Sequence, residues 1–137
     1  GRKFGRQVVA YKGPVRRWDT FWADLEPGVG REQKGERRPV IVISNDGFNA
    51  AFEMVTVVSM TPLEKKKRKV YPFEVVLPAG TVTPEWSSIV LTHQIRSISQ
   101  LRLLEPIGAI VDDEHRRQIE SRLLEHLDIL FEEDDEF

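Results

Sequence analysis

The stretch from residue 22 to residue 46 reads WADLEPGVGREQKGERRPVIVISND, and it joins two predicted strands through a polar loop. Its last part, PVIVIS at 39–44, is rich in β-branched residues, which is typical of a strand buried on both faces. Pro39 is the first residue of this run, a position at which a strand tolerates the absence of a backbone N–H donor. The aromatic residues 18–23 predict the strand before the loop, and the turn chemistry of DLEPG ends it. Residues 28–37 are polar and without period, so they predict a loop long enough to carry function.

Further short strands follow along the chain, separated by turn-forming and polar segments. They are predicted at 54–60, 72–77, 88–92, 94–99 and 107–111, with a turn at 45–47 and one helical turn at 100–104.

The last part of the chain has a different period. From Asp112 onward, apolar residues recur at spacings of 4, 4 and 3, which is one stripe of an amphipathic helix. The stripe consists of Ile119, Leu123, Leu127 and Leu130. We expect it to lie in the core or in a dimer interface. Many short strands before one terminal helix predict a mainly β fold, a compact barrel with the helix packed on it.

The composition is that of a soluble globular chain with one domain over residues 1–137. Of the 137 residues, 40% are hydrophobic and 31% are charged. No apolar run has the length of a bilayer span, and the N-terminus lacks a signal peptide pattern, so we expect a cytoplasmic protein. The sequence contains no cysteine, which excludes thiolate nucleophiles and cysteine-based metal sites. Its histidines, His93, His115 and His126, lack metal-ligand spacing, so the sequence predicts no metal site and no cofactor.

The charge is divided unevenly along the chain. Residues 1–110 contain 17 Lys and Arg against 11 Asp and Glu, whereas residues 111–137 contain 3 against 11. A basic body attracts an anionic polymer, and an acidic end can compete for the same surface. The simplest interpretation of residues 132–136 (EEDDE) is a solvated tail, and the sharper hypothesis is that they weakly screen a nucleic-acid groove.

The quoted stretch also carries a family resemblance. An aromatic strand, the DLEP turn, the loop GREQKGERRP and a Val/Ile strand ending in SND resemble the start of the MazF/PemK (Kid) family of toxin endoribonucleases. Later segments fall in the family's order, at 55–61 (VTVVSMT), 72–77 (PFEVVL), 88–98 (SIVLTHQIRSI) and 102–110 (RLLEPIGAI). The resemblance covers residues 17–130, between a basic extension at 1–16 and an acidic tail at 131–137. Trp18 stands where glycine is common in the family.

This resemblance implies an SH3-like barrel of the CcdB/PemK type, a homodimer, and metal-independent cleavage of single-stranded RNA at short preferred sequences. It also implies a cognate antitoxin whose acidic, partly disordered C-terminal segment lies across the RNA site. DNA would be reached only through that antitoxin. Metal-free cleavage uses the ribose 2′-OH as nucleophile and leaves a 2′,3′-cyclic phosphate and a 5′-OH, so the enzyme must move two protons and stabilise phosphoryl charge.

The resemblance assigns candidate catalytic residues. Arg38 matches the family's arginine before proline, and its planar donor fork suits phosphate oxygens. Thr61 matches a threonine that helps to hold the scissile phosphate, although a turn threonine before Pro62 is the structural alternative. Glu32 is expected to take or relay a proton, or to form an ordinary loop ion pair. His93 stands where many members carry an acidic residue, and it is a candidate acid or base or a structural histidine.

The remaining candidates are expected to contact RNA, with ordinary solvated or structural roles as the alternative. The set is Gln33, Arg37, Lys65, Lys66, Lys67, Arg68, Gln94 and Arg96. Among the aromatic residues, Trp86 is the better stacking candidate because it lies in a polar connection. Phe21, Trp22 and Phe73 are expected in the core.

Two rival functions remain open from the sequence. CcdB-like gyrase poisons share this type of fold, but they depend on an aromatic-Gly-Ile type of C-terminus, whereas this chain ends in FEEDDEF. A catalytically silent RNA-binding barrel would use Arg38 and Thr61 for binding alone. Only an activity measurement separates the second rival from an enzyme.

Overall fold

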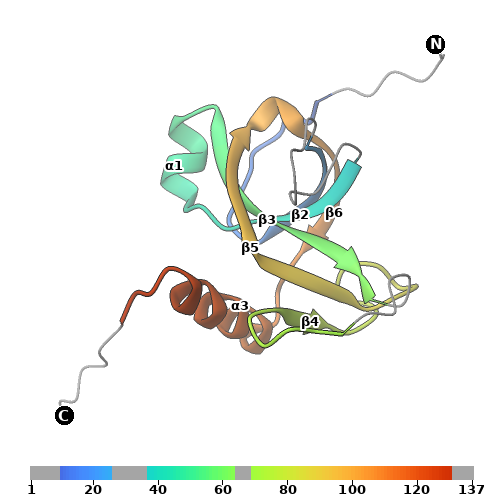
Figure 1. Cartoon of the computed structure of the whole chain (residues 1–137). Coiled ribbons are helices and arrows are strands. Elements are labelled where there is room, and N and C mark those ends of the chain that lie inside the picture. The colour runs from blue at the N-terminus through green and yellow to red at the C-terminus, as the bar shows by residue number, and fades with distance from the viewer. Residues whose placement is uncertain (1–9, 26–36, 64–68, 131–137) are drawn as a thin grey trace.

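The computed structural model describes residues 10–25, 37–63 and 69–130, and these form a curled antiparallel sheet with a helix across one end (Figure 1). The strand order is β4-β5-β3-β2-β1-β6. The strands are β1 (Asp19–Asp24), β2 (Arg37–Val42), β3 (Met54–Pro62), β4 (Val75–Leu77), β5 (Ser88–Ser99) and β6 (Leu103–Ala109). The helices are α1 (Asp46–Ala51), the 3-10 turn η1 (Gln100–Arg102) and α3 (Asp113–His126). The mainly β class with a C-terminal helix, as predicted, is confirmed.

Both faces of the central strands are covered by apolar side chains. Residues along β2 alternate between the two sides of the sheet. Val40 and Val42 belong to one core cluster, and we call the side of the sheet on which they lie the first face. Ile41 belongs to a second cluster on the opposite side, which we call the second face. The first face also holds Phe21 and Val57. The second face is covered by α3, whose Ile119 and Leu123 pack there, which explains why the β2 sequence is apolar without alternation.

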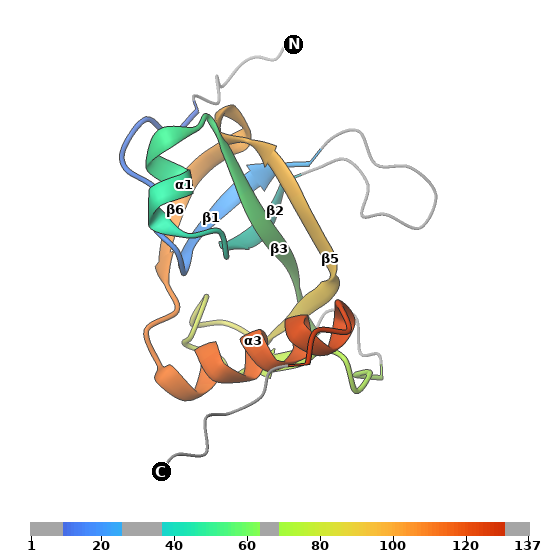
Figure 2. The same cartoon turned by 90° about the vertical axis from the view of Figure 1, so that its left-hand side faces the viewer.

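Helix α3 begins at a well-formed cap and lies across the end of the sheet, next to β4 and β5 (Figure 2). The Asp112 carboxylate accepts hydrogen bonds from the backbone N–H groups of Glu114 and His115. The bond from His115 is the main cause that lowers the pKa of Asp112 below its usual value. No helix in the described part of the chain is long and apolar enough to span a membrane.

Trp18, the residue before β1, has an unusual backbone conformation. Its φ is +79°, which non-glycine residues rarely adopt, and its side chain is only 6% exposed. The backbone N–H of Trp18 donates to the Val42 carbonyl, and its own carbonyl accepts from the Ile110 N–H. The guanidinium groups of Arg17 and Arg116 lie 4.7 Å and 5.5 Å from the ring centroid. Burial and these contacts offset the strain that glycine would avoid at this position.

Several sequence predictions were wrong in detail. The turn predicted at 45–47 is the start of helix α1, because the Asn45 side chain accepts from the Phe48 N–H and caps the helix. The last strand occupies 103–109 instead of 107–111, and β4 begins only at Val75. Phe73 was expected in the core and is exposed.

Half of the predicted helix stripe lies in the core. Ile119 and Leu123 are buried, whereas Leu127 is 50% and Leu130 is 92% exposed. The α-helix ends at His126, and Asp128 takes a φ of +58°, so the period of 3.6 residues no longer applies to the last two positions.

Candidate active site

Arg38 and Thr61 come from neighbouring central strands and share the first face of the sheet. The register pairs Val40 with Ser59 and Ile41 with Val58, and its continuation puts Arg38 opposite Thr61. Residues that lie opposite each other in an antiparallel pair project to the same face. The strands therefore bring together two candidates that are far apart in the sequence.

Both side chains hold buried polar atoms that lack a protein partner. Among the described residues, Arg38 Nε and Thr61 Oγ1 are shielded from solvent and make no hydrogen bond. Buried polar groups in proteins are nearly always paired, so unpaired ones call for a reason. A guanidinium and a hydroxyl held beside each other in this state suit an anionic ligand that supplies acceptor oxygens.

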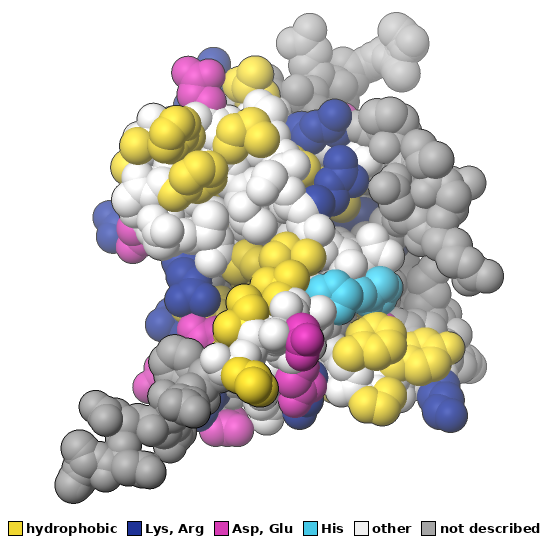
Figure 3. All heavy atoms as spheres, turned by 60° about the vertical axis from the view of Figure 1, so that its left-hand side comes forward, with side chains coloured by type: hydrophobic (Ala, Val, Ile, Leu, Met, Phe, Trp, Pro, Cys, Tyr) yellow, Lys and Arg dark blue, Asp and Glu magenta, His cyan; other side chains and the backbone are white. Residues whose placement is uncertain are grey.

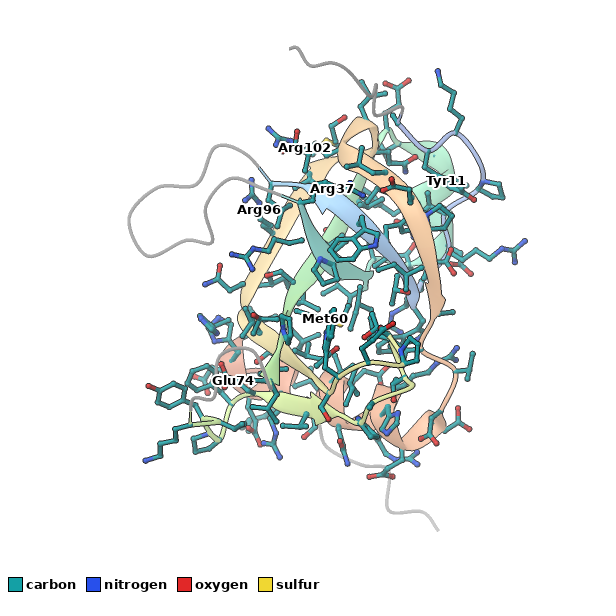
Figure 4. The ribbon with its side chains drawn as sticks, turned by 90° about the vertical axis from the view of Figure 1, so that its right-hand side faces the viewer. Tyr11, Arg37, Met60, Glu74, Arg96 and Arg102 are labelled. Atoms are coloured by element: carbon teal, nitrogen blue, oxygen red, sulfur yellow. The ribbon has the colours of Figure 1, made fainter. Side chains whose placement is uncertain are left out.

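A second arginine lies on the same face. Arg96 of β5 is opposite Val57 of β3, four residues before Thr61 and therefore on the first face. Figure 4 shows Arg96, Arg37 and Arg102 in one region of the molecule, at the opposite end from Glu74. Arg102 donates to the Asp24 carbonyl at 3.0 Å, which fixes its guanidinium. Arg37 and Arg102 line one surface pocket together, so these two cationic side chains lie close to each other.

Arg37 points to the second face, unlike its neighbour Arg38. Its guanidinium forms an ion pair with Glu105 and lies 5.6 Å from the centroid of the Trp22 ring. Both partners of the ion pair are partly exposed, so the pair contributes little to stability. Arg37 is therefore a positioned cation at the surface.

A pocket of about 320 Å³ lies behind Arg38, at the ends of four strands. Its floor consists of Trp22, Pro39, Pro62 and Ser88, which the register assigns to the second face. Its other walls come from the connection between β4 and β5 and from the start of β2. These wall residues are Val82, Thr83, Trp86, Arg37 and Arg38.

Comparison with known proteins identifies the family. A model of the PemK-like, MazF-like toxin of type II toxin-antitoxin system matches residues 16–127. The chain belongs to this family. It is 37% identical over 117 residues to Endoribonuclease MazF9 of Mycobacterium tuberculosis, covering 84% of this chain and 98% of that protein. It is 38% identical over 109 residues to Endoribonuclease EndoA of Bacillus subtilis, covering 80% and 90%. The crystal structure of MazF (Form-I) from Deinococcus radiodurans superposes with a TM-score of 0.72 at 26% identity, covering 86% and 100%.

In this MazF-like toxin, the structure does not bring His93 into the pocket. His93 is exposed and lies in a bulge of β5, where the pairing passes from Leu91 to Ile95 between Ser59 and Val58 of β3. The His93 and Phe73 rings are nearly perpendicular with their centroids 5.0 Å apart, and His93 Nε2 lies 3.3 Å from the side-chain amide nitrogen of Gln94.

Tyr71, Phe73 and His93 form an exposed set of rings, which we call the aromatic ledge. Tyr71 and Phe73 stack with centroids 5.5 Å apart and planes 2° from parallel. Figure 3 shows histidine next to exposed hydrophobic side chains on this side of the molecule. Buried Glu74 supports the ledge, because its carboxylate accepts from the Tyr71 N–H.

Some predicted site residues of the toxin lie outside the described residues. They are Glu32, Gln33, Lys65, Lys66, Lys67 and Arg68. In the part of the chain that the structure describes, no three acidic or histidine side chains gather as metal ligands.

Sequence reasoning missed the pocket and two of its features. Trp22 was expected in the core, but it is half-buried and lines the pocket. Thr83 was not singled out, yet its buried hydroxyl is another polar atom without a partner in the described structure. The sequence did indicate Trp86 as a stacking candidate, because this tryptophan lies in a polar connection. No local pattern marks Thr83, because its role depends on strands that lie far from it in the sequence.

Proposed function

We propose that this protein is the endoribonuclease toxin of a toxin-antitoxin system and that it cleaves single-stranded RNA at short preferred sequences without a metal ion. Membership of the MazF-like family and its endoribonuclease relatives support the broad activity. The observation that carries the chemistry is the opposed pair of Arg38 and Thr61, whose buried polar atoms have no partner among the described residues. A scissile phosphate would supply the missing acceptors.

In the proposed reaction, the ribose 2′-oxygen attacks the adjacent phosphorus, and the bond from phosphorus to the 5′-oxygen breaks. The 2′-OH loses its proton, the 5′-oxygen gains one, and the products are a 2′,3′-cyclic phosphate and a 5′-OH. Arg38 stabilises the charge that develops on the phosphoryl oxygens, and the bidentate geometry of its guanidinium suits that task. Thr61 donates its hydroxyl hydrogen to one of these oxygens.

The two proton transfers are proposed for Glu32 and His93. A carboxylate in the loop can accept the 2′-OH proton, and an imidazole titrates near neutrality and can donate one. His93 is exposed and packs on Phe73, so a substrate must reach it at the aromatic ledge. Catalytic contacts of this kind tighten when substrate binds.

The other basic and amide side chains are proposed to hold the RNA backbone. Arg37 precedes Arg38 in β2, and Arg96 of β5 lies on the same face of the sheet as Arg38. Each neutralised phosphate releases counterions, so binding should weaken steeply as salt increases. The proposed contacts also include Gln33, Lys65, Lys66, Lys67, Arg68 and Gln94.

A cognate antitoxin is the proposed protein partner, and its acidic, partly disordered C-terminal segment would occupy the same basic surface. The family description as a toxin of a toxin-antitoxin system supports this partner. We further propose a homodimer that acts in the cytoplasm and meets DNA only through the antitoxin. The exposed Leu127 and Ile129 after α3 offer apolar surface for self-association.

The test is to incubate purified protein with cellular RNA in excess EDTA and to map the new 5′-ends. We expect cleavage at a short recurring sequence, with 5′-OH and cyclic phosphate ends. A single deoxyribose at the scissile position should abolish cleavage while most binding remains. A strict need for Mg²⁺, or cleavage of the deoxy substrate, would overturn the mechanism. Binding without any cleavage would identify a silent RNA-binding barrel, and gyrase inhibition would identify the CcdB-type alternative.

A further inference from the structure

The 320 Å³ pocket behind Arg38 has the composition of a site for a flat, polar-edged ring. Two of its lining residues are tryptophans, and two are prolines that add apolar surface without a side-chain donor. Pockets that bind small ligands have volumes of about 300–1,000 Å³ and combine apolar walls with a few polar groups. A nucleobase has both an aromatic face for stacking and a hydrogen-bonding edge.

The connection from β4 to β5 holds Thr83 and Trp86 in place from both sides. A tight turn precedes Thr83, in which the Gly80 N–H donates to the Thr83 carbonyl at 2.7 Å and Gly80 takes a φ of +96°. Val82 packs on the second core cluster. After Trp86, the Leu63 N–H donates to the Ser87 carbonyl at 2.9 Å. The wall is therefore ordered before any ligand arrives, which lowers the entropy cost of binding.

Thr83 supplies the polar group that such a site needs. Its hydroxyl is buried and has no hydrogen-bond partner among the described residues, although Thr83 lines the pocket. A hydroxyl can donate and accept, so it can meet either kind of group on the edge of a base. Rotation about χ1 moves Oγ1 between three staggered positions.

The pocket is connected to the proposed reaction centre through one residue. Arg38 projects from the first face beside Thr61, and it also lines the pocket on the second face because it lies near the start of β2. Arg37 stands at the same rim with its guanidinium near Trp22. A strand of RNA that passes over the ends of β2 and β3 would place its phosphate at Arg38 and the next base in the pocket.

We propose that this pocket is a nucleobase subsite. In it, the base next to the scissile phosphate stacks on the indole ring of Trp86, and the Thr83 hydroxyl forms a hydrogen bond with the edge of that base. The inference rests on the proposed function, because it names the part of the RNA that the same site selects. It assigns to Thr83 and Trp86 a role in sequence preference.

The first experiment measures sequence preference with a pool of RNAs that are randomised around the cleavage site. Thr83→Val removes the hydroxyl and keeps the shape, and we expect it to reduce discrimination at one position beside the cleaved bond by about five-fold. Thr81→Val is the matched control, because Thr81 lies in the same turn and outside the pocket lining. An unchanged preference at every position in Thr83→Val would overturn the inference.

The second experiment measures binding and does not depend on cleavage. Short 2′-O-methyl RNAs, each with one abasic residue at a different position, are titrated against the parent and Trp86→Ala. We expect one abasic position to weaken binding to the parent by about ten-fold and to have no further effect in Trp86→Ala. Equal losses in both proteins at every position would overturn the subsite. If the parent fails to cleave RNA, the proposed function fails, while this measurement still decides whether the pocket holds a base.

Discussion

The strand ends around Arg38 and the aromatic ledge around His93 differ in how their polar groups are satisfied. At the strand ends, Arg38 Nε and Thr61 Oγ1 are buried and have no partner in the described structure. On the ledge, His93 is exposed and packs edge-on against Phe73. Buried unpaired donors are costly for folding and useful for binding an anion, whereas exposed stacked rings cost little and suit contact with bases. The difference predicts that charge stabilisation depends on the first region, whereas base contacts and one proton transfer depend on the second.

The largest effect is expected at Arg38. Arg38→Ala should lower the single-turnover rate of RNA cleavage by about 100- to 1,000-fold, because it removes a preorganised charge from the developing phosphorane. Arg38→Lys should restore little of the rate, since an ammonium lacks the bidentate fork. Arg122→Ala, which removes an arginine of α3 that pairs with Glu125, is the control for removing a positive charge. A folded Arg38→Ala protein that cleaves within a few-fold of the parent would remove Arg38 from the mechanism.

Thr61→Val is expected to separate activity from stability. The variant loses one neutral hydrogen bond to the phosphate, so cleavage should fall by about ten-fold. It also removes a buried hydroxyl that has no protein partner among the described residues, so the free energy of unfolding should rise by about 1 kcal/mol. Denaturant unfolding and single-turnover rates give the two numbers. A loss of stability with unchanged cleavage would show that Thr61 is a structural residue.

The ledge can be tested by changing the chemistry of His93 while its ring is kept. His93→Phe keeps a ring on the ledge but cannot transfer a proton, so it should bind RNA within about two-fold of the parent and cleave it about ten-fold more slowly. His93→Ala should in addition weaken RNA binding by about five-fold through lost stacking. The pH dependence of cleavage provides the independent readout, because His93→Phe should lose one limb of the profile near neutral pH. Cleavage by His93→Phe within about two-fold of the parent, with an unchanged pH profile, would remove His93 from the proton transfers.

The smallest effect is expected at the rim of the pocket. Glu105→Gln releases Arg37 from its ion pair, so RNA binding at low salt should tighten by about two-fold. The gain should shrink as salt increases, because exposed charges are screened. Glu125→Gln, which removes the partner of Arg122 on α3, is the matched control. Equal affinity for the parent and Glu105→Gln at low salt would mean that Arg37 does not touch RNA.

Local sequence patterns predicted most strands and the terminal helix because the information that they use is short-range. β-branched runs and the apolar period of α3 gave the elements within a few residues. Helix α1 was missed, since Asn45 begins both turns and helices and only the Phe48 N–H in the structure distinguishes them. The exposure of Phe73 was also missed, because stacking on Tyr71 replaces burial in the core.

The candidate site likewise combines features that local sequence predicts with features that only the folded chain reveals. The sequence by itself determined the family blocks, the identities of Arg38 and Thr61, and the alternation that sends neighbouring residues to opposite faces. Only the tertiary structure decided that Arg38 stands opposite Thr61 and that His93 stands apart with Phe73. The pocket also forms only in the tertiary structure, because its lining combines the ends of strands with the connection at 78–87. The reason is that strand register and bulges are set by long-range pairing and packing, which no short stretch of sequence contains.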